Sequence, residues 1–248
     1  MPKIITALII LLSSLAGQAE PQLSRLSPPV FEVQYNLYRS GAKIARIQRR
    51  ISQLENSQFE YSSETKTIGV VSLFRKDHII EKSIWDFHDN IPKPGFYSYQ
   101  HTGGKKDRAV SIRFDWDEFR ITNTINGDAW QMPTEPAAMD KLLYQVALML
   151  DLEAGNSVFS YSIADGGKIK NYTFEKLGSE TIKTSLGEFD TIKMIRYKDN
   201  GKRSVTFWCA KALRFLPVRV ENIEKSGKKT VAKIRSLNGI SSAAAEVP

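Results

Sequence analysis

Tight-turn signals recur along this chain, and apolar and polar residues alternate in the segments between them. Glycine, asparagine and aspartate tolerate the positive φ angles that tight hairpin turns demand. The signals stand at Ser40-Gly41, Asn126-Gly127, Asp165-Gly166-Gly167, Asn200-Gly201 and Ser226-Gly227. Because such turns join neighbouring antiparallel strands, their repetition predicts a meander of many strands.

The alternation itself is clearest in two segments. In residues 110–116 the even-numbered side chains are apolar, and in residues 31–37 the odd-numbered ones are. Phe174, Ile182 and residues 189–194 continue the habit. A period of two places the apolar side chains on one face of a half-buried strand.

One segment, residues 134–152, departs from this alternation and predicts a helix. Thr134 suits the N-cap, and Glu135 suits the positive end of the helix dipole. The apolar residues at helical spacing are Met139, Leu142, Leu143, Val146 and Leu150. Leu148 and Met149 make the opposite face apolar too, as in a helix buried on several sides. The predicted fold class is mainly β: an antiparallel meander forming an open or partial β-barrel around one buried α-helix.

The N-terminus predicts export. Lys3 precedes an apolar run over residues 4–12, and Gly17 and Ala19 are the small residues that a signal peptidase requires. Cleavage is expected between Ala19 and Glu20, with an uncleaved membrane anchor as the alternative. A transmembrane helix needs roughly 20 apolar residues, and no segment reaches that length. The mature chain is therefore expected in the periplasm, without a transmembrane segment.

The 248 residues suit one domain, since β-barrels and sandwiches commonly reach about 200–250 residues. We expect a signal peptide over residues 1–19, a flexible lead over 20–30, a single β-rich domain over 31–240 and a flexible tail over 241–248. The net charge is +8, but the basic residues are scattered rather than gathered on one helix, which argues against a nucleic-acid partner. A single cysteine cannot form an internal disulfide, so the core alone must hold the fold.

The cysteine is the first candidate for chemistry. Cys209 shares a strand face with Val205 and Phe207, and no histidine follows it in the sequence. A packed core thiol is therefore favoured over a nucleophile, which needs a base and an electropositive setting. The surrounding segment, residues 207–221, is expected to be two strands and their connection.

Two acidic clusters are the other candidates. His88 lies among Asp86 and Asp89, but zinc usually takes three or four protein ligands, and a polar strand end explains the pattern better. Asp115 and Asp117 are spaced like the carboxylate pair of a glycosidase, yet turn-forming acids at a hairpin tip account for them. No catalytic residue, metal or cofactor is predicted.

Several short blocks occur in an order that resembles one known family. They are Glu81-Lys82-Ser83 with Trp85, Asp140-Lys141-Leu142 with Tyr144-Gln145, Leu186 to Ile192, Phe207-Trp208, and Leu216 to Glu221. Together they are similar to the Gram-negative envelope family catalogued as domain of unknown function 3108, from about residue 31 to about residue 237. The chain departs from the family pattern at Leu143, where a small polar residue is expected, and at Met149, where a basic one is.

The resemblance implies an exported protein with a mostly β fold and no established activity. Its architecture is also similar to open-barrel lipoprotein carriers and lipocalin-like binders. That similarity is one of fold and not of function.

The leading hypothesis is an exported, non-enzymatic protein that binds a lipid or other hydrophobic ligand of the cell envelope. A partial barrel has interior apolar surface that a ligand can cover. The candidate groove residues are Trp85, Trp116, Leu143, Met149 and Trp208. Ordinary core packing is the alternative for each of them. The competing hypotheses are a protein- or glycan-interaction module in envelope biogenesis, and an enzyme that uses Asp115, His88 or Cys209.

Overall fold

The structure is a computed structural model that describes residues 28–88 and 91–240. This part of the chain contains one α-helix, α1 (Leu143–Glu153), and one 14-stranded sheet. The strands are β1 (Phe31–Arg39), β2 (Ala42–Gln53), β3 (Phe59–Thr67), β4 (His78–His88), β5 (Ile91–Thr102), β6 (Arg108–Asp115), β7 (Arg120–Ile125), β8 (Asp128–Pro133), β9 (Phe159–Ala164), β10 (Ile169–Thr184), β11 (Gly187–Lys198), β12 (Arg203–Ala210), β13 (Leu216–Ile223) and β14 (Lys229–Asn238). The predicted signal peptide with its cleavage site, and the predicted tail, lie outside the described residues.

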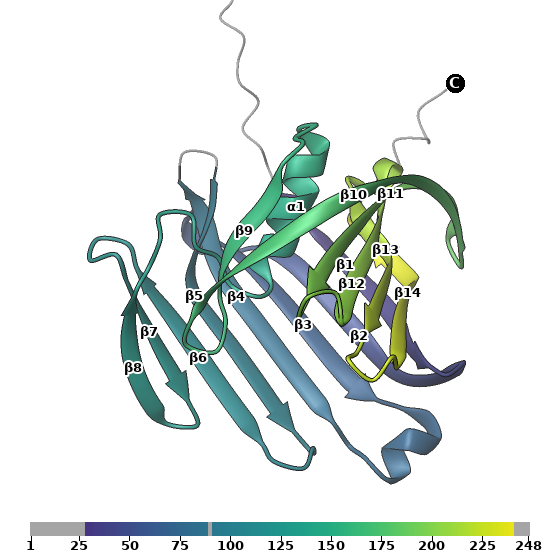
Figure 1. The fold of residues 1–248 in the computed structure, drawn as a ribbon, viewed down its shortest axis with the longest axis horizontal. Coiled ribbons are helices and arrows are strands. Elements are labelled where there is room, and N and C mark those ends of the chain that lie inside the picture. The colour runs from purple at the N-terminus through teal and green to yellow at the C-terminus, as the bar shows by residue number, and fades with distance from the viewer. Residues whose placement is uncertain (1–27, 89–90, 241–248) are drawn as a thin grey trace, which may run out of the picture.

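The sheet is a meander that curls into an open barrel (Figure 1). Its order is β8-β7-β6-β5-β4-β3-β2-β1-β14-β13-β12-β11-β10-β9. Neighbouring strands are antiparallel throughout, and the first and last strands pair with each other in the middle of the sheet. The two edge strands, β8 and β9, do not pair, so the barrel is not closed, and α1 lies between these two strands in the chain. The predicted fold class is confirmed.

The five turn signals join consecutive strands, as the sequence predicts. Asn126 and Gly127, for example, link β7 to β8 with φ angles of 49° and 100°. The segment at 207–221 is also confirmed as two strands, β12 and β13, with their connection. Pro217 is the second residue of β13, a position where the missing amide costs the ladder little.

The helix begins later than the sequence predicts. Residues 134–142 are not helical. Met139 instead lies parallel to Ile163 of β9, held by two backbone hydrogen bonds of 2.8 Å. The prediction that Thr134 caps the helix was therefore wrong, and its amide donates to the carbonyl of Phe119 at 2.9 Å. Pairing with a distant strand overrides the helical spacing of the local sequence.

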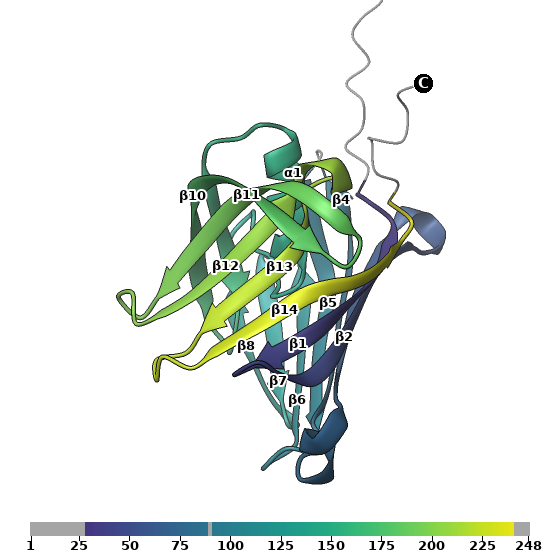
Figure 2. The ribbon, with the colours of Figure 1, turned by 90° about the vertical axis from the view of Figure 1, so that its right-hand side faces the viewer.

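The helix lies at one end of the barrel and packs against β5 and β9 (Figure 2). All residues from Leu143 to Leu150 are buried, which confirms a helix that is apolar on several sides. The core is completed by inward side chains of the strands, such as Val33, Ile51 and Met194. Each of these buried side chains contributes about 1.5–3 kcal/mol by leaving water.

Candidate functional site

The residues that begin the helix also hold it in the barrel. The Asp140 carboxylate is fully buried, and its Oδ1 accepts hydrogen bonds of 2.8 Å from the amides of Leu142 and Leu143. Its Oδ2 accepts a hydrogen bond of 2.5 Å from Ser83 Oγ on β4. Burial, opposed by these hydrogen bonds, raises the pKa of Asp140 from 3.8 to about 6. Asp140 thus ties the start of α1 to the sheet.

Other residues of the sequence blocks that resemble the known family, Gln145 and Glu81, lie at the same place. Gln145 Oε1 accepts a hydrogen bond of 2.7 Å from Arg49 Nη1 on β2. Glu81 Oε1 accepts one of 2.5 Å from the hydroxyl of Tyr97 on β5. Blocks that are far apart in the sequence therefore join α1 and the residues before it to β2 and β4, and join β4 to β5.

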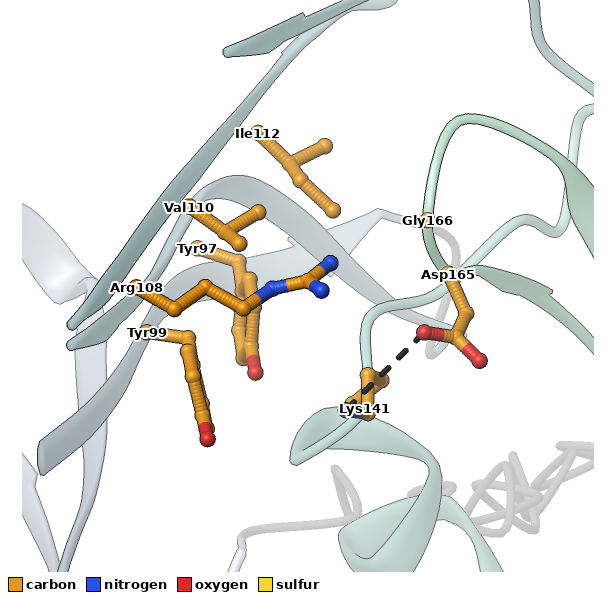
Figure 3. A pocket seen from close by; sticks show the side chains of 8 residues that line it. All are labelled: Tyr97, Tyr99, Arg108, Val110, Ile112, Lys141, Asp165 and Gly166. Carbon is orange, nitrogen blue, oxygen red and sulfur yellow. Dashed lines mark ion pairs between the residues drawn. The ribbon is translucent and has the colours of Figure 1, made fainter. Parts of the chain in front are cut away.

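Beside this junction lies a cavity of about 300 Å³ (Figure 3). It is bounded by β5, by β6, by Lys141, which lies two residues before α1, and by the β9–β10 turn. The lining residues are Tyr97, Tyr99, Arg108, Val110, Ile112, Lys141, Asp165 and Gly166. Ile112 and Tyr97 are buried, whereas Arg108 is exposed. The cavity therefore has an apolar floor and a charged rim.

The charges at the rim are unequally paired. Asp165 accepts Lys170 at 2.7 Å and lies 3.9 Å from Lys141 Nζ. Lys141 Nζ also lies 5.5 Å from the centre of the Tyr99 ring. Arg108 has no ion pair among the described residues. The rim thus carries more positive than negative charge.

A second cavity, of about 120 Å³, lies on the inner face of the other half of the barrel. Its lining residues are Tyr35, Leu37, Ile47, Arg49, Val220, Asn222, Thr230 and Ala232. Arg49 connects the two regions, since it lines this cavity and binds Gln145 of α1.

Three of the predicted groove residues are packed in the core. Trp85 is 1% exposed, and its ring stacks on Phe59 at 4.9 Å between centroids. Leu143 and Met149 are buried in α1. None of the three lines either cavity.

The other two predicted groove residues lie elsewhere. Trp116 is half-buried, and its Nε1 donates to the carbonyl of Pro94 at 2.9 Å. Trp208 is buried, and its Nε1 donates to Glu180 Oε2 at 2.9 Å. Neither lines the two cavities, and ligand contact by any of the five residues stays a prediction.

The candidates for chemistry are dispersed. Cys209 is fully buried, and burial raises the pKa of its thiol. Asp115 Oδ1 accepts the amide of Glu118 at 3.0 Å, as a turn residue does. His88 Nε2 lies 2.9 Å from Asp86 Oδ1, while Asp89 lies outside the described residues. Among residues 28–88 and 91–240, no three potential metal ligands come together.

The sheet and its enclosed helix define an open, β-barrel-like protein. The chain belongs to the family described as protein of unknown function DUF3108, whose model matches residues 30–233. No curated protein matches the chain. In the described part, α1 is too short to cross a bilayer as a helix.

One solved structure supports the same fold. A β-barrel-like protein of the DUF1849 domain family from Brucella abortus is 8% identical, with a TM-score of 0.55 over 86% of this chain and 98% of that chain. A candidate lipoprotein from Parabacteroides distasonis is 10% identical over 86% of this chain and 96% of that chain, with a TM-score of 0.33. The first of these shows the β-barrel-like fold, and it shows no function.

The residues around the cavity were not predicted as a site, although the sequence contains a signal for them. Arg108 has the same parity as Val110 and Ile112, so the alternation of β6 turns it inward. In the same way Arg49 follows the parity of Ile47 on β2. A charged residue at an inward position of an alternating strand is the informative pattern.

Proposed function

We propose that this chain is a non-enzymatic binding protein of the cell envelope, and that its ligand is a lipid or a similar amphiphile. The observation that carries the proposal is the cavity of about 300 Å³ on the inner face of a barrel that does not close. Sites for small molecules have volumes of roughly 300–1,000 Å³, apolar walls and a few polar groups. This cavity has that composition, at the lower end of the range.

The side chains that line the cavity support an amphiphile as the ligand. Ile112 and the ring of Tyr97 offer buried apolar surface to the cavity, while Arg108 is exposed and Lys141 half-buried. A ligand with an apolar chain and a polar end would match both regions. The proposed location in the periplasm rests on the signal-peptide pattern of residues 1–19.

The first test is to purify the mature protein from periplasm without detergent and to analyse an organic extract by mass spectrometry. The proposal predicts a lipid or another apolar molecule in stoichiometric amount. An empty extract from folded protein, together with no binding of added fluorescent fatty acids, would overturn it.

A pair of variants locates the ligand. Val110→Trp adds bulk at the inner face of β6 and should displace the ligand. Ser111→Trp adds the same bulk on the opposite face of the same strand and should leave the ligand bound. Equal ligand content in both variants, with folding confirmed by circular dichroism, would place the ligand outside this cavity.

The exposed edge of the sheet favours a second candidate function, a module that binds an envelope protein or glycan. Strand β8 pairs with β7 on one side and with no strand of the described chain on the other, and five of its six residues are exposed. An unpaired edge can accept an extended peptide as an additional strand. Photocrosslinking from Gln131 in living cells would test this function, and capture of the same partner from Ser111 would argue against the edge.

A further inference from the structure

A buried arginine without an acid partner lies on the inner face. Arg196 of β11 is 4% exposed, and among the described residues no carboxylate pairs with it. Its Nε is buried and has no hydrogen-bond partner. The Tyr172 ring lies 3.4 Å from the guanidinium carbon and covers one face of the group. A ring over the face accepts no hydrogen bond from Nε–H, which therefore stays without an acceptor, and a buried charge without an ion pair is costly.

Arg196 is connected to the cavity through Tyr172. The Tyr172 hydroxyl donates to Asp165 Oδ2 at 3.4 Å, and Asp165 lines the cavity. Lys198, two residues after Arg196 on β11, lies 5.8 Å from the same ring. Arg196 and Lys198 therefore continue the positive charge that begins with Lys141 at the rim.

Lys198 lies close to several other cations. Burial, then Arg196, Arg203 and Lys141, lower the pKa of Lys198 to about 8, and Asp165 opposes them. The acids nearby are already engaged. Asp165 binds Lys170, and Glu81 accepts the hydroxyl of Tyr97. Neither Arg196 nor Lys198 therefore has an ion pair among the described residues, although the negative charges of Glu81 and Asp165 remain nearby.

We infer that the ligand of this barrel carries an oxyanion head group, a carboxylate or a phosphate, and that the head group binds the cationic cluster formed by Arg108, Lys141, Arg196 and Lys198. An oxyanion would supply an acceptor for the Nε–H of Arg196 and an opposite charge for the two cations that lack an ion pair. The inference rests on the proposed function, because the apolar chain of the same ligand would occupy the cavity floor.

The test compares three amphiphiles that share one chain length: laurate, dodecyl phosphate and the neutral monolauroylglycerol. Binding to the full mature chain, stripped of lipid and refolded, is measured by calorimetry below the micelle concentration. We expect the anionic amphiphiles to bind about tenfold or more tightly than the neutral one, the effect of one hydrogen bond to a charged group. The stronger of the two anions identifies the head group as carboxylate or phosphate.

Two sets of variants locate the effect. Arg108→Gln with Lys141→Gln alters only partly or fully exposed rim residues, and Arg196→Gln alters the buried one. Each should weaken the binding of laurate and dodecyl phosphate more than the binding of monolauroylglycerol, and so reduce the preference for anions. The matched control is Arg113→Gln with Lys176→Gln, which removes the same charge from exposed positions of β6 and β10 that do not line the cavity.

The outcomes separate this inference from the proposed function. Equal affinity for all three amphiphiles would overturn the anionic head group and leave the binding protein intact. An equal loss of preference in the control variant would also overturn it, because general charge would then explain the effect. Binding of none of the three would overturn both proposals. If Arg196→Gln fails to fold, the rim variant alone decides.

Discussion

Replacing Asp140 with asparagine should change how the stability of the protein responds to pH. The carboxyl is fully buried, and burial raises its pKa from 3.8 to about 6. Between these values the folded chain keeps a proton that the unfolded chain has released. The stability that this proton provides is fully present below the unfolded pKa and is lost as the pH rises through about 6.

The magnitude follows from the gap between the two pKa values. The gap from 3.8 to about 6 is about two pH units, which corresponds to about 3 kcal/mol. Asparagine does not titrate, and its Oδ1 can still accept the amides of Leu142 and Leu143. The Asp140→Asn variant should therefore gain about 3 kcal/mol on the wild type between about pH 3 and pH 7.

Urea unfolding followed by tryptophan fluorescence at both pH values measures this gain. Asp117→Asn removes the same charge from an exposed turn and reports the effect of charge loss alone. Asp140→Ala should be less stable than Asp140→Asn by about 2–4 kcal/mol, since it loses the cap and leaves Ser83 without its partner. Parallel changes of wild type and Asp140→Asn with pH would refute the reasoning.

Three further predictions concern packing. Leu143→Ala should cost about 2–5 kcal/mol of unfolding free energy, because the side chain is fully buried. An unchanged affinity of this variant for laurate would show that Leu143 is a core residue and not a groove residue. In Gly167→Ala the new Cβ would lie 2.5 Å from Trp130 Cζ2, and the backbone has a φ of 77°. The left-handed backbone alone should cost about 1–2 kcal/mol of unfolding free energy, and the further loss from the clash should disappear when Trp130→Ala is added. Strictly additive losses in the double variant would contradict the contact. Cys209 should resist a thiol reagent in the native state and react fully in urea, and rapid native labelling would show an open core.

The strands and turns could be predicted from the sequence because their determinants are local. Alternation in residues 110–116 and the Asn126-Gly127 pair specify a face and a turn within a few residues. The start of the helix could not be predicted, because it depends on contacts between distant residues. Met139 pairs with Ile163, and Asp140 binds Ser83, 57 residues away in the sequence.

The candidate site was harder to predict for a related reason. The tryptophans and the apolar helix residues were singled out by size and hydropathy, and these properties describe a core as well as they describe a groove. Trp85 and Leu143 are core residues in the structure. The more useful signal is a cation at an inward position, such as Arg196 among the apolar residues of β11. Its meaning becomes visible only when the neighbouring strands show that no acid faces it.

The opening of the barrel and the position of the helix have one cause. Closure would require β8 to pair with β9, but the segment before α1 already uses the edge of β9. Met139 N donates to Ser162 O and Ala164 N donates to Met139 O, both at 2.8 Å. The chain that enters the barrel to form the helix therefore occupies backbone groups that β8 would need. The β9–β10 turn follows directly, so Asp165 and its cavity lie beside the unclosed seam.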